Sequence, residues 1–515
     1  MRFTKKFTFA GIVFVSALLA GCSSLSHNSS PLTLDEKLAK EYQRYEKAQQ
    51  LVLAQYQNAE LPREKKTISR SHWEEILAAQ SDEAFTTAEL AELRGRQERR
   101  IEASRKAAVK ASIIDFSPWR TLPTEKAHQK IRQFCEAVPK GGMLHVHPWG
   151  SLSAPTFKNL LATSNPVIPA KTLHGNLSDT RGQAYLYPDE LAWLETLPAE
   201  ARFRDLSEAD RARVVQMGIL PAGTHSFERF EAPFRFVALV MASDWHSITV
   251  AYEDFAQRAV RAGVQYVEFT ESISPEDVPR YERLAAKLVA EYGLVVRFNV
   301  AFFRTHNPAS QHLAVKNMLN KMESPIITGI DLLANEMHAP ALETGQAVYG
   351  PVMAANVEKK GRWHRTMHAG EHGDARNPRD ALLLGAERLG HGVRLAENPV
   401  VMQYAADQHV PIEINLTSNL KLRAIEDIRA HPYLTYLRLG MPVSLSTDDE
   451  GIFETDINGE CELAVAKTDV TYHEYKQMAF NSIQTSFASD DIKRQLLEEL
   501  RQRFDRFEQK QKSVQ

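Results

Sequence analysis

The sequence predicts an α/β protein, a (β/α)8 TIM barrel with an all-helical extension before it and an insertion after its first strand. From residue 140 onward, short apolar stretches alternate with helical ones, which is typical of parallel strands buried on both faces. Eight such units favour a closed barrel over an open sheet. The strand candidates are residues 142–147, 265–270, 295–302, 326–331, 365–369, 388–391, 411–416 and 442–447.

The parts around this barrel differ in composition. Residues 23–115 are rich in Glu, Lys, Gln, Ala and Leu, with apolar residues at helical spacing, which predicts the helical extension. Residues 116–515 carry the barrel. The stretch between the first strand and the next helix is too long for a structureless connection. We therefore predict that residues 152–226 form an insertion over the top face of the barrel, near the active site.

The first 22 residues form a separate leader. Three basic residues among the first six precede an apolar stretch that is too short for a comfortable membrane span. Leu19-Ala20-Gly21-Cys22 then matches the cleavage site of bacterial lipoproteins. We expect a signal peptide over residues 1–22, lipidation of Cys22, and a lipid anchor in the bacterial cell envelope, at the outer membrane. The alternative is an uncleaved N-terminal anchor.

Composition excludes few classes of function. Charged residues make up 25% of the chain, hydrophobic residues 43%, and the formal net charge is -3. These values are ordinary for a soluble globular protein. Nothing in this balance points to nucleic acid, and we expect no nucleic-acid partner.

Two cysteines remain beyond the leader, Cys135 and Cys461. An envelope location permits a disulfide. Cys135 precedes the first barrel strand, at the bottom of the barrel, whereas Cys461 follows the last strand, nearer the top. Two buried free thiols are therefore the preferred interpretation, and the disulfide remains the alternative.

Four metal-ligating side chains fall at predicted strand ends. His145 and His147 are two apart on a strand, so both point into the barrel. His368 ends the fifth strand and Asp448 ends the eighth. Three imidazoles and one carboxylate suit one Zn²⁺ with a position open for water.

Three further side chains at the same edge are candidates for proton handling. His391 ends the sixth strand and is placed to hold a water, and Glu371, just beyond His368, can protonate a substrate. Asp449 can accept a hydrogen bond from the substrate. Each motif alone is weak, because structural histidines and capping acids are common. Their common position at the strand ends of one barrel makes the combination specific.

These motifs carry a resemblance to a known family. The sequence resembles the adenosine and AMP deaminases of the amidohydrolase superfamily over roughly residues 125–500. The layout of the N-terminal helices and of the insertion is similar to that of secreted, growth-factor-type adenosine deaminases. The matching motifs, in family order, are Met143-Leu144-His145-Val146-His147, Thr328-Gly329-Ile330-Asp331-Leu332-Leu333-Ala334-Asn335-Glu336, His368-Ala369-Gly370-Glu371, Arg388-Leu389-Gly390-His391-Gly392 and Ser444-Leu445-Ser446-Thr447-Asp448-Asp449.

The resemblance implies a role for each site residue. The zinc ligands would be His145, His147, His368 and Asp448. Glu371 would protonate the purine nitrogen N1, and His391 would orient or deprotonate the attacking water. Asp449 would face N7, and the backbone of Gly329 would meet N3. The implied reaction is hydrolytic loss of ammonia from C6 of a 6-aminopurine nucleoside. The family layout also suggests a homodimer formed through the N-terminal helices.

One position departs from the family pattern. In intracellular adenosine deaminases the run after the second histidine contains an Asp that contacts the ribose, whereas here Trp149 takes that place. An indole can stack on a ring but cannot accept that hydrogen bond. The sequence therefore leaves open whether the substrate is adenosine, deoxyadenosine, adenine or a modified purine.

Two alternative functions remain at this stage. One is another amidohydrolase with a single metal that acts on a different amine or amide. The fourth strand carries no Lys to bridge two metals, which favours one metal. The other is a non-catalytic, nucleoside-binding lipoprotein, which the presence of both Glu371 and His391 disfavours.

Overall fold

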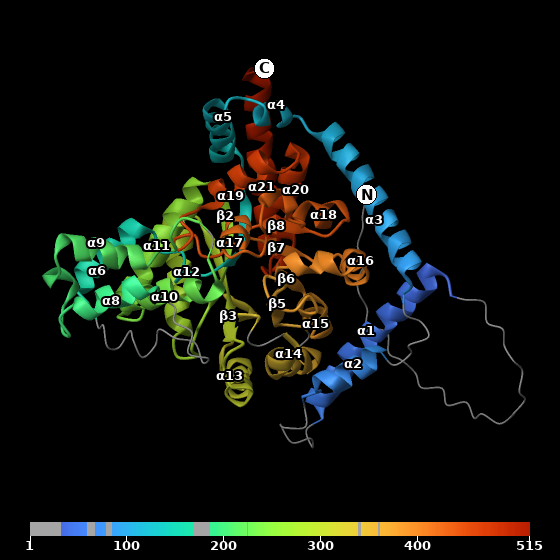
Figure 1. The fold of residues 1–515 in the computed structure, drawn as a ribbon, viewed down its shortest axis with the longest axis horizontal. Helices are drawn as coiled ribbons and strands as arrows, with labels where there is room; N and C mark the ends of the chain where they lie inside the picture. The colour runs from blue at the N-terminus through green and yellow to red at the C-terminus, as the bar shows by residue number, and fades with distance from the viewer. Residues whose placement is uncertain are drawn as a thin grey trace, which may run out of the picture.

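The computed structural model of the protein describes residues 32–58, 67–78, 85–168, 186–223, 225–337, 341–358 and 361–514. Eight parallel strands follow one another in the order β1 to β8 and are surrounded by helices, so the predicted (β/α)8 barrel is confirmed (Figure 1). The strands are β1 (Gly141–Val146), β2 (Val264–Glu271), β3 (Val295–Phe303), β4 (Ile327–Leu333), β5 (His364–Ala369), β6 (Arg388–His391), β7 (Ile412–Ile414) and β8 (Val443–Leu445).

The apolar pattern explains why these segments are strands. Every residue of β1 and β2 is buried, as expected for parallel strands covered on both faces. The predicted strand boundaries differ from the observed ones by no more than two residues at either end. The local sequence pattern is therefore sufficient to locate the barrel.

Helices of the barrel follow the strands along the chain and pack outside them. Helix α11 precedes β2, and the last three helices follow β8. Their bounds are α11 (Trp245–Arg261), α12 (Val278–Tyr292), α13 (Pro308–Lys321), α14 (Ala341–Glu358), α15 (Asn377–Leu383), η4 (Val393–Glu397), α16 (Pro399–Asp407), α17 (Leu416–Lys421), η5 (Ile428–Ala430), α18 (Tyr433–Arg438), α19 (Ile457–Lys467), α20 (Tyr472–Gln484) and α21 (Asp490–Val514).

Closure of the barrel takes place between β8 and β1. The backbone N–H of His147 donates to the carbonyl of Asp448 (3.0 Å), and the N–H of Asp448 donates to the carbonyl of His145 (3.1 Å). Two residues before Asp448, the hydroxyl of Ser446 accepts from the backbone N–H groups of Leu144 (2.9 Å) and His145 (3.1 Å). Backbone and side-chain hydrogen bonds thus both join the first and last strands.

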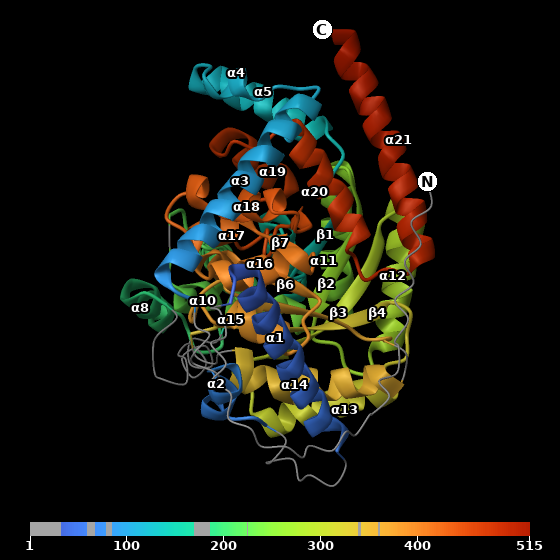
Figure 2. The same ribbon diagram turned by 90° about the vertical axis from the view of Figure 1, so that its right-hand side faces the viewer.

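The N-terminal extension is helical, as predicted, and it packs along the outside of the barrel (Figure 2). Helix α1 contacts α14, and α3 contacts α16, α18 and α20. Side chains such as Tyr45 and Trp73 join the main hydrophobic core, so the apolar sides of these helices face the barrel. Pairing of two subunits through them stays a prediction and would use their outer faces. The helices of the extension are α1 (Leu34–Gln57), α2 (Arg70–Ala78) and α3 (Thr87–Ala111), and α4 (Ser117–Arg120) and α5 (Thr124–Ala137) follow them before β1.

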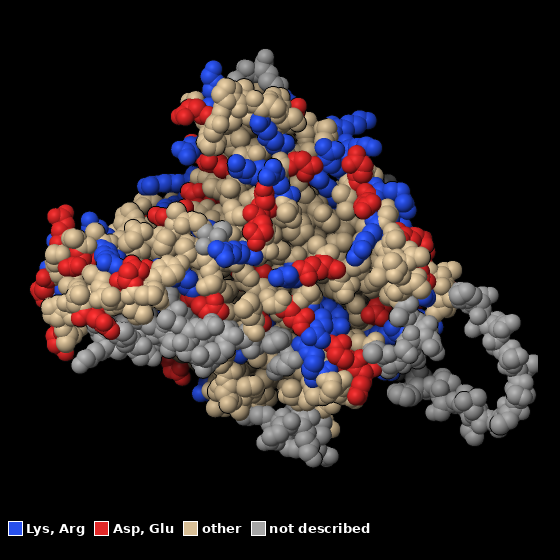
Figure 3. All heavy atoms as spheres, viewed as in Figure 1, with Lys and Arg blue, Asp and Glu red and all other residues tan. Residues whose placement is uncertain are grey.

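Charge is mixed over the surface. Basic and acidic side chains are interspersed on the face shown in Figure 3. On α3, Arg96 pairs with Asp35 (2.6 Å), and Arg105 pairs with Asp469 (2.7 Å). The basic character of this helix is therefore balanced by acidic neighbours.

The predicted signal peptide, residues 1–22 with Cys22, lies outside the described residues. Among the helices of the described chain, none has the length and apolar character needed to cross a membrane.

The insertion after β1 folds around a hydrophobic core of its own, beside the barrel (Figure 1). Phe157, Leu194 and Phe203 from within residues 152–226 pack with Phe236 of the helix that follows. The unit therefore extends beyond the predicted insertion and includes α10. Its elements are α6 (Ala154–Ser164), α8 (Pro188–Thr196), η3 (Phe203–Asp205), α9 (Glu208–Met217) and α10 (Phe227–Met241).

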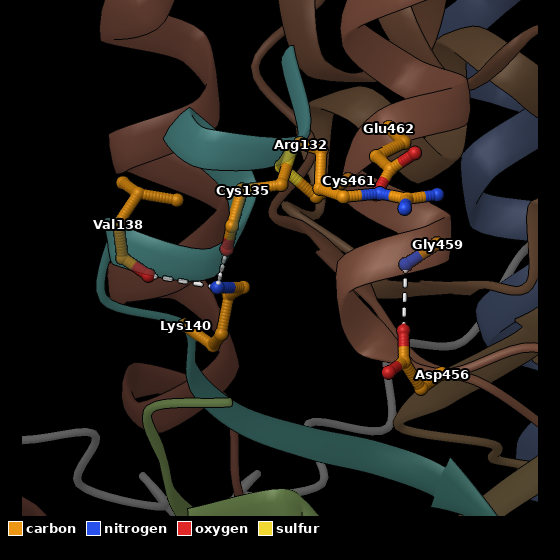
Figure 4. The surroundings of a disulfide bond; sticks show 8 residues. All are labelled: Arg132, Cys135, Val138, Lys140, Asp456, Gly459, Cys461 and Glu462. Carbon is orange, nitrogen blue, oxygen red and sulfur yellow. Dashed lines mark hydrogen bonds and ion pairs between the residues drawn. A yellow bond between two sulfur atoms is a disulfide. The ribbon is translucent and has the colours of Figure 1, made fainter. Parts of the chain in front are cut away.

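The prediction of two free thiols is wrong, because Cys135 and Cys461 form a disulfide (Figure 4). Cys135 lies in α5 and Cys461 in α19, and these two helices pack against each other. Although α19 follows the last strand, it lies beside the helix that precedes the first one, so the Cα atoms are only 5.8 Å apart. The bond spans 326 residues of sequence and ties the start of the barrel to its end.

Replacing both cysteines by serine should destabilise the protein. Removing a cross-link over so long a loop releases entropy in the unfolded chain, and we expect a loss of about 2–4 kcal/mol in the free energy of unfolding. Urea unfolding with and without a thiol reductant measures it. Reductant should lower the stability of the wild type to that of the double variant and leave the variant unchanged. Equal stability of the two oxidised proteins would contradict the prediction.

Candidate metal centre and active site

A cavity of about 700 Å³ opens at the carboxyl ends of the strands, where (β/α)8 barrels carry their sites. Seven of the sequence-predicted site residues line it. They come from the ends of β1, β5, β6 and β8 and from the loops that follow. They are His147, Trp149, His368, Glu371, His391, Asp448 and Asp449.

The four predicted metal ligands converge at the floor of this cavity. The Nε2 atom of His147 lies 3.2 Å from Oδ1 of Asp448 and 3.2 Å from Nε2 of His368. The Nε2 atom of His145 lies 3.6 Å from the same Asp448 oxygen. His391, whose Nε2 lies 3.9 Å from the other oxygen of Asp448, groups closely with His145, His368 and Asp448, whereas His147 groups with Asp448 and Asp449. Side chains far apart in sequence thus place their ligand atoms around one point.

Behind two of these imidazoles lie buried carboxylates. The Nδ1–H of His145 donates to Glu413 (2.8 Å), and the Nδ1–H of His368 donates to Asp331 (3.0 Å). A proton held on Nδ1 leaves the Nε2 lone pair directed at the cluster, as a metal ligand requires. Among the described residues, the buried Nε2 of His145 has no hydrogen-bond partner.

The electrostatics of the cluster also fit a cation. Burial disfavours a charged imidazole, yet the carboxylates of Asp449 and Asp448 raise the pKa of His147 to about 10. The site therefore stabilises positive charge strongly. Three imidazoles and a carboxylate form a donor set that suits a divalent transition metal.

A buried ion-pair chain holds the carboxylate behind His145. Glu413 on β7 accepts from Nε of Arg388 (2.7 Å), and the same guanidinium pairs with Glu268 (2.5 Å) on β2. All three side chains are almost fully buried. Sequence reasoning missed them, although charged residues inside otherwise apolar strands were a usable signal. Buried charges of this kind are kept only where they are paired.

Glu371 lines the cavity in surroundings that favour its protonated form. Burial, reinforced by the Asp448 carboxylate, raises the pKa of Glu371 well above its ordinary value. Its backbone N–H and that of Gly370 donate to Glu336 (3.0 and 2.9 Å), which fixes the turn after β5. Burial and Asp448 likewise raise the pKa of Asp449. A carboxylic acid that keeps its proton at neutral pH can deliver it to a substrate.

The backbone at the site is strained at three non-glycine residues. Ala334, His391 and Asp448 have φ values of 81°, 61° and 60°, in the left-handed region. Each costs of order 1–3 kcal/mol, and such costs concentrate at functional sites. Next to His391, a Cβ on Gly390 would come within 2.7 Å of Cε1 of His145, so only glycine leaves room for that ring.

Gly329 lies on the fourth strand, as predicted, and its contact with N3 stays a prediction. It is in the interior of β4, opposite Asn299 and His364, and does not belong to the described lining of the cavity. The cavity opens beyond the end of the strand, and Ala334 is the residue of this motif that reaches it. Trp149 does line the cavity, and it also packs against the core of the insertion unit.

Helix α10 forms a wall of the cavity that sequence reasoning did not find. Phe227, Glu228, Glu231 and Arg235 line the cavity at helical spacing. Glu271 of β2, whose pKa burial raises to about 7, also lines the cavity. In the sequence, Glu228 and Glu231 stand three residues apart in an otherwise apolar helix, and this pattern could have indicated a helix that faces a polar cavity.

The fold and the site together define a protein of the amidohydrolase superfamily. The profile of the adenosine deaminase family matches residues 205–503, and the chain belongs to that family. The protein is therefore a hydrolytic deaminase.

Known adenosine deaminases align with about half of this chain. That of Escherichia coli O1:K1 / APEC is 29% identical over 266 residues, which are 49% of this chain and 76% of the relative. That of Shigella flexneri is 30% identical over 270 residues, with the same coverage of 49% and 76%.

Solved structures share the fold at lower identity. Adenine deaminase from Arthrobacter aurescens has a TM-score of 0.53 and 23% identity, over 71% of this chain and 99% of that one. The Arabidopsis N6-mAMP deaminase has a TM-score of 0.53 and 19% identity, over 72% and 99% of the two chains.

Asp331→Asn should weaken metal binding. The amide cannot hold the Nδ1 proton of His368 as a carboxylate does, and loss of such a partner typically costs about 10–100-fold in metal affinity. Competition with a chromogenic chelator measures the affinity. Thr270→Val is the matched control, because it removes the other hydrogen bond to Asp331 (2.9 Å) without touching the histidine. Unchanged affinity in Asp331→Asn would remove Asp331 from the metal centre.

Proposed function

We propose that the protein is a zinc-dependent hydrolytic deaminase of adenosine or a closely related 6-aminopurine nucleoside. One observation carries the proposal: the ligand atoms of His145, His147, His368 and Asp448 approach one another at the cavity that Glu371 also lines, and burial raises the pKa of Glu371. Membership of the adenosine deaminase family supports it.

The residues divide the work between binding and proton transfer. His145, His147, His368 and Asp448 would hold Zn²⁺, which when bound makes water a nucleophile at neutral pH. Glu371 donates its proton to N1 of the purine as a C–O bond forms at C6. Asp449 faces N7, and His391 positions the attacking oxygen. The C6–N bond then breaks: the added hydroxyl gives its proton to the amino group, which leaves as ammonia, and a carbonyl forms at C6. The other proton of the water restores Glu371.

The lining of the cavity favours an uncharged nucleoside over a nucleotide. Among the described residues that line the cavity, Glu228, Glu231 and Glu271 stand beside one guanidinium, that of Arg235. Burial raises the pKa of Glu231 and of Glu271, so these groups supply hydrogen-bond partners for ribose hydroxyls but no cation for a phosphate. The two glutamates of α10 would thereby replace the acid that is missing at Trp149, whose ring supplies a stacking surface.

The protein's location belongs to the same proposal. The leader with Cys22 implies a lipid anchor in the bacterial envelope, and the Cys135–Cys461 disulfide supports an oxidising compartment. There the enzyme would act on nucleosides outside the cytoplasm, as a monomer or as a dimer formed through the N-terminal helices.

Glu371→Gln should abolish turnover and keep the metal. The amide has the same shape but cannot give up a proton, so kcat with adenosine should fall by at least about 100-fold. The loss of absorbance near 265 nm as adenosine is deaminated measures the rate, and metal analysis measures the zinc. Wild-type, zinc-loaded protein that turned over none of adenosine, deoxyadenosine and adenine would overturn the proposed function. A Glu371→Gln variant with most of the wild-type rate would overturn only the role of Glu371.

Adenosine should be preferred over AMP by at least about 100-fold in kcat/KM, which corresponds to ~3 kcal/mol of charge repulsion and lost hydrogen bonds. The double variant Glu228→Gln with Glu231→Gln should narrow this ratio, because kcat/KM should fall for adenosine and rise for AMP. Glu208→Gln, an exposed acid in the same unit, is the control and should change neither. Wild-type protein that preferred AMP would contradict the assignment of the substrate.

A further inference from the structure

Distance alone does not separate the metal ligands from the other histidine of the cluster. Ligand atoms of His145, His368, His391 and Asp448 all lie within 4.8 Å of one another, so His391 could itself bind the metal. An imidazole binds a metal through a nitrogen that carries no proton. The partner of the opposite ring nitrogen therefore decides whether a histidine is a ligand.

A hydrogen-bond chain behind His391 starts at a backbone amide. The N–H of Tyr433 donates to Nδ1 of His431 (3.2 Å), and a backbone N–H can only donate. His431 is buried, which lowers its pKa to about 3 and keeps the ring neutral. Because its Nδ1 accepts, its single ring proton is on Nε2.

The chain then passes through one asparagine. The Nε2–H of His431 donates to Oδ1 of Asn419 (3.0 Å). The amide orientation of Asn419 is thereby fixed, and its Nδ2 donates to Nδ1 of His391 (2.9 Å). All three side chains are buried. Two further polar groups, Nδ2 of Asn415 (3.5 Å) and Oε1 of Glu371 (3.8 Å), lie farther from this nitrogen.

We propose that Asn419 and His431 are positioning residues that hold His391 as the Nε2–H tautomer. In this form His391 donates a hydrogen bond into the site and is not a metal ligand. His145 and His368 are the opposite case, because carboxylates hold their protons on Nδ1 and leave Nε2 free for a metal. The tautomer stands on the hydrogen bonds alone, and only its use in deamination rests on the proposed function.

This assignment narrows the part that His391 plays in the reaction. Its Nε2 is buried, has no hydrogen-bond partner among the described residues, and points towards the metal cluster. With a proton on that nitrogen, His391 cannot take a proton from water there. It orients the attacking oxygen by donating to it, so its role is that of a hydrogen-bond donor and not of a base.

Asn419→Asp tests the proposal by reversing the hydrogen bond at nearly constant shape. A carboxylate only accepts, so it should draw the proton of His391 to Nδ1. Nitrogen-15 NMR of histidine-labelled full-length protein, with His391 assigned by its alanine variant, reads the tautomer directly. We expect Nε2–H in the wild type and Nδ1–H in the variant, with kcat for adenosine about 100-fold lower and KM little changed.

Two controls separate tautomer control from loss of stability. Asn481→Asp, at another buried asparagine that donates to the carbonyl of Val443 (3.0 Å), should destabilise the fold without changing the His391 spectrum. His431→Phe should leave the Asn419 amide free to rotate, so that His391 populates both tautomers. His431→Gln keeps a side-chain donor to Asn419, so His391 should stay in the Nε2–H form.

Metal content provides a readout that does not need activity. His391→Ala should keep one metal per chain, whereas His368→Ala should lose it. Loss of metal in His391→Ala, or an Nδ1–H tautomer in the wild type, would overturn the proposal. If the tautomer and the metal content are as expected but adenosine is not turned over, the proposed substrate fails and the hydrogen-bond chain stands.

Discussion

Closure of the barrel between β8 and β1 is the constraint on which the site depends. His145 and His147 come from one side of this junction and Asp448 from the other, and the backbone hydrogen bonds that close the barrel join these same residues. Strand pairing therefore sets the separation of the ligands before any metal binds. A shift of one residue at this junction would turn the alternating side chains of β1 away from the barrel interior and dismantle the site.

Two other features act on the same junction. At the opposite end of the barrel, the Cys135–Cys461 disulfide joins α5 to α19, the helices that flank β1 and β8. At the site itself, a metal held by residues of both strands would stabilise the closed barrel through its own binding free energy. Chain closure and metal binding are consequently coupled. The strained φ angles of His391 and Asp448 are tolerated because this surrounding structure over-determines them.

The sequence predicts well those parts whose signal is local. An apolar stretch that ends in a polar residue reveals both the strand and its functional end, which is how His368, His391 and Asp448 were found. Long-range geometry was not predictable in this way. The pairing of Cys135 with Cys461 depends on where α19 lies relative to α5, and the contribution of α10 to the cavity depends on how the insertion unit packs. Motif matching identifies the fourth strand but not which residue of it reaches the cavity, where Ala334 and not Gly329 belongs to the described lining.

The histidines at the strand ends show why a list of ligand types is an incomplete description of such a site. His145, His368 and His391 are chemically identical and lie within a few ångströms of one point. In the proposed site their functions diverge through the group behind each ring: a carboxylate would make an imidazole a metal ligand, and an amide would make it a hydrogen-bond donor. The side-chain amide of Asn419 can rotate, so by itself it could present either its oxygen or its nitrogen to His391. Its direction is set by His431 and finally by the backbone N–H of Tyr433, a group that cannot reverse. In this proposal the backbone N–H of Tyr433 fixes the tautomer of His431, His431 fixes the amide of Asn419, and Asn419 fixes the tautomer of His391 at the metal cluster.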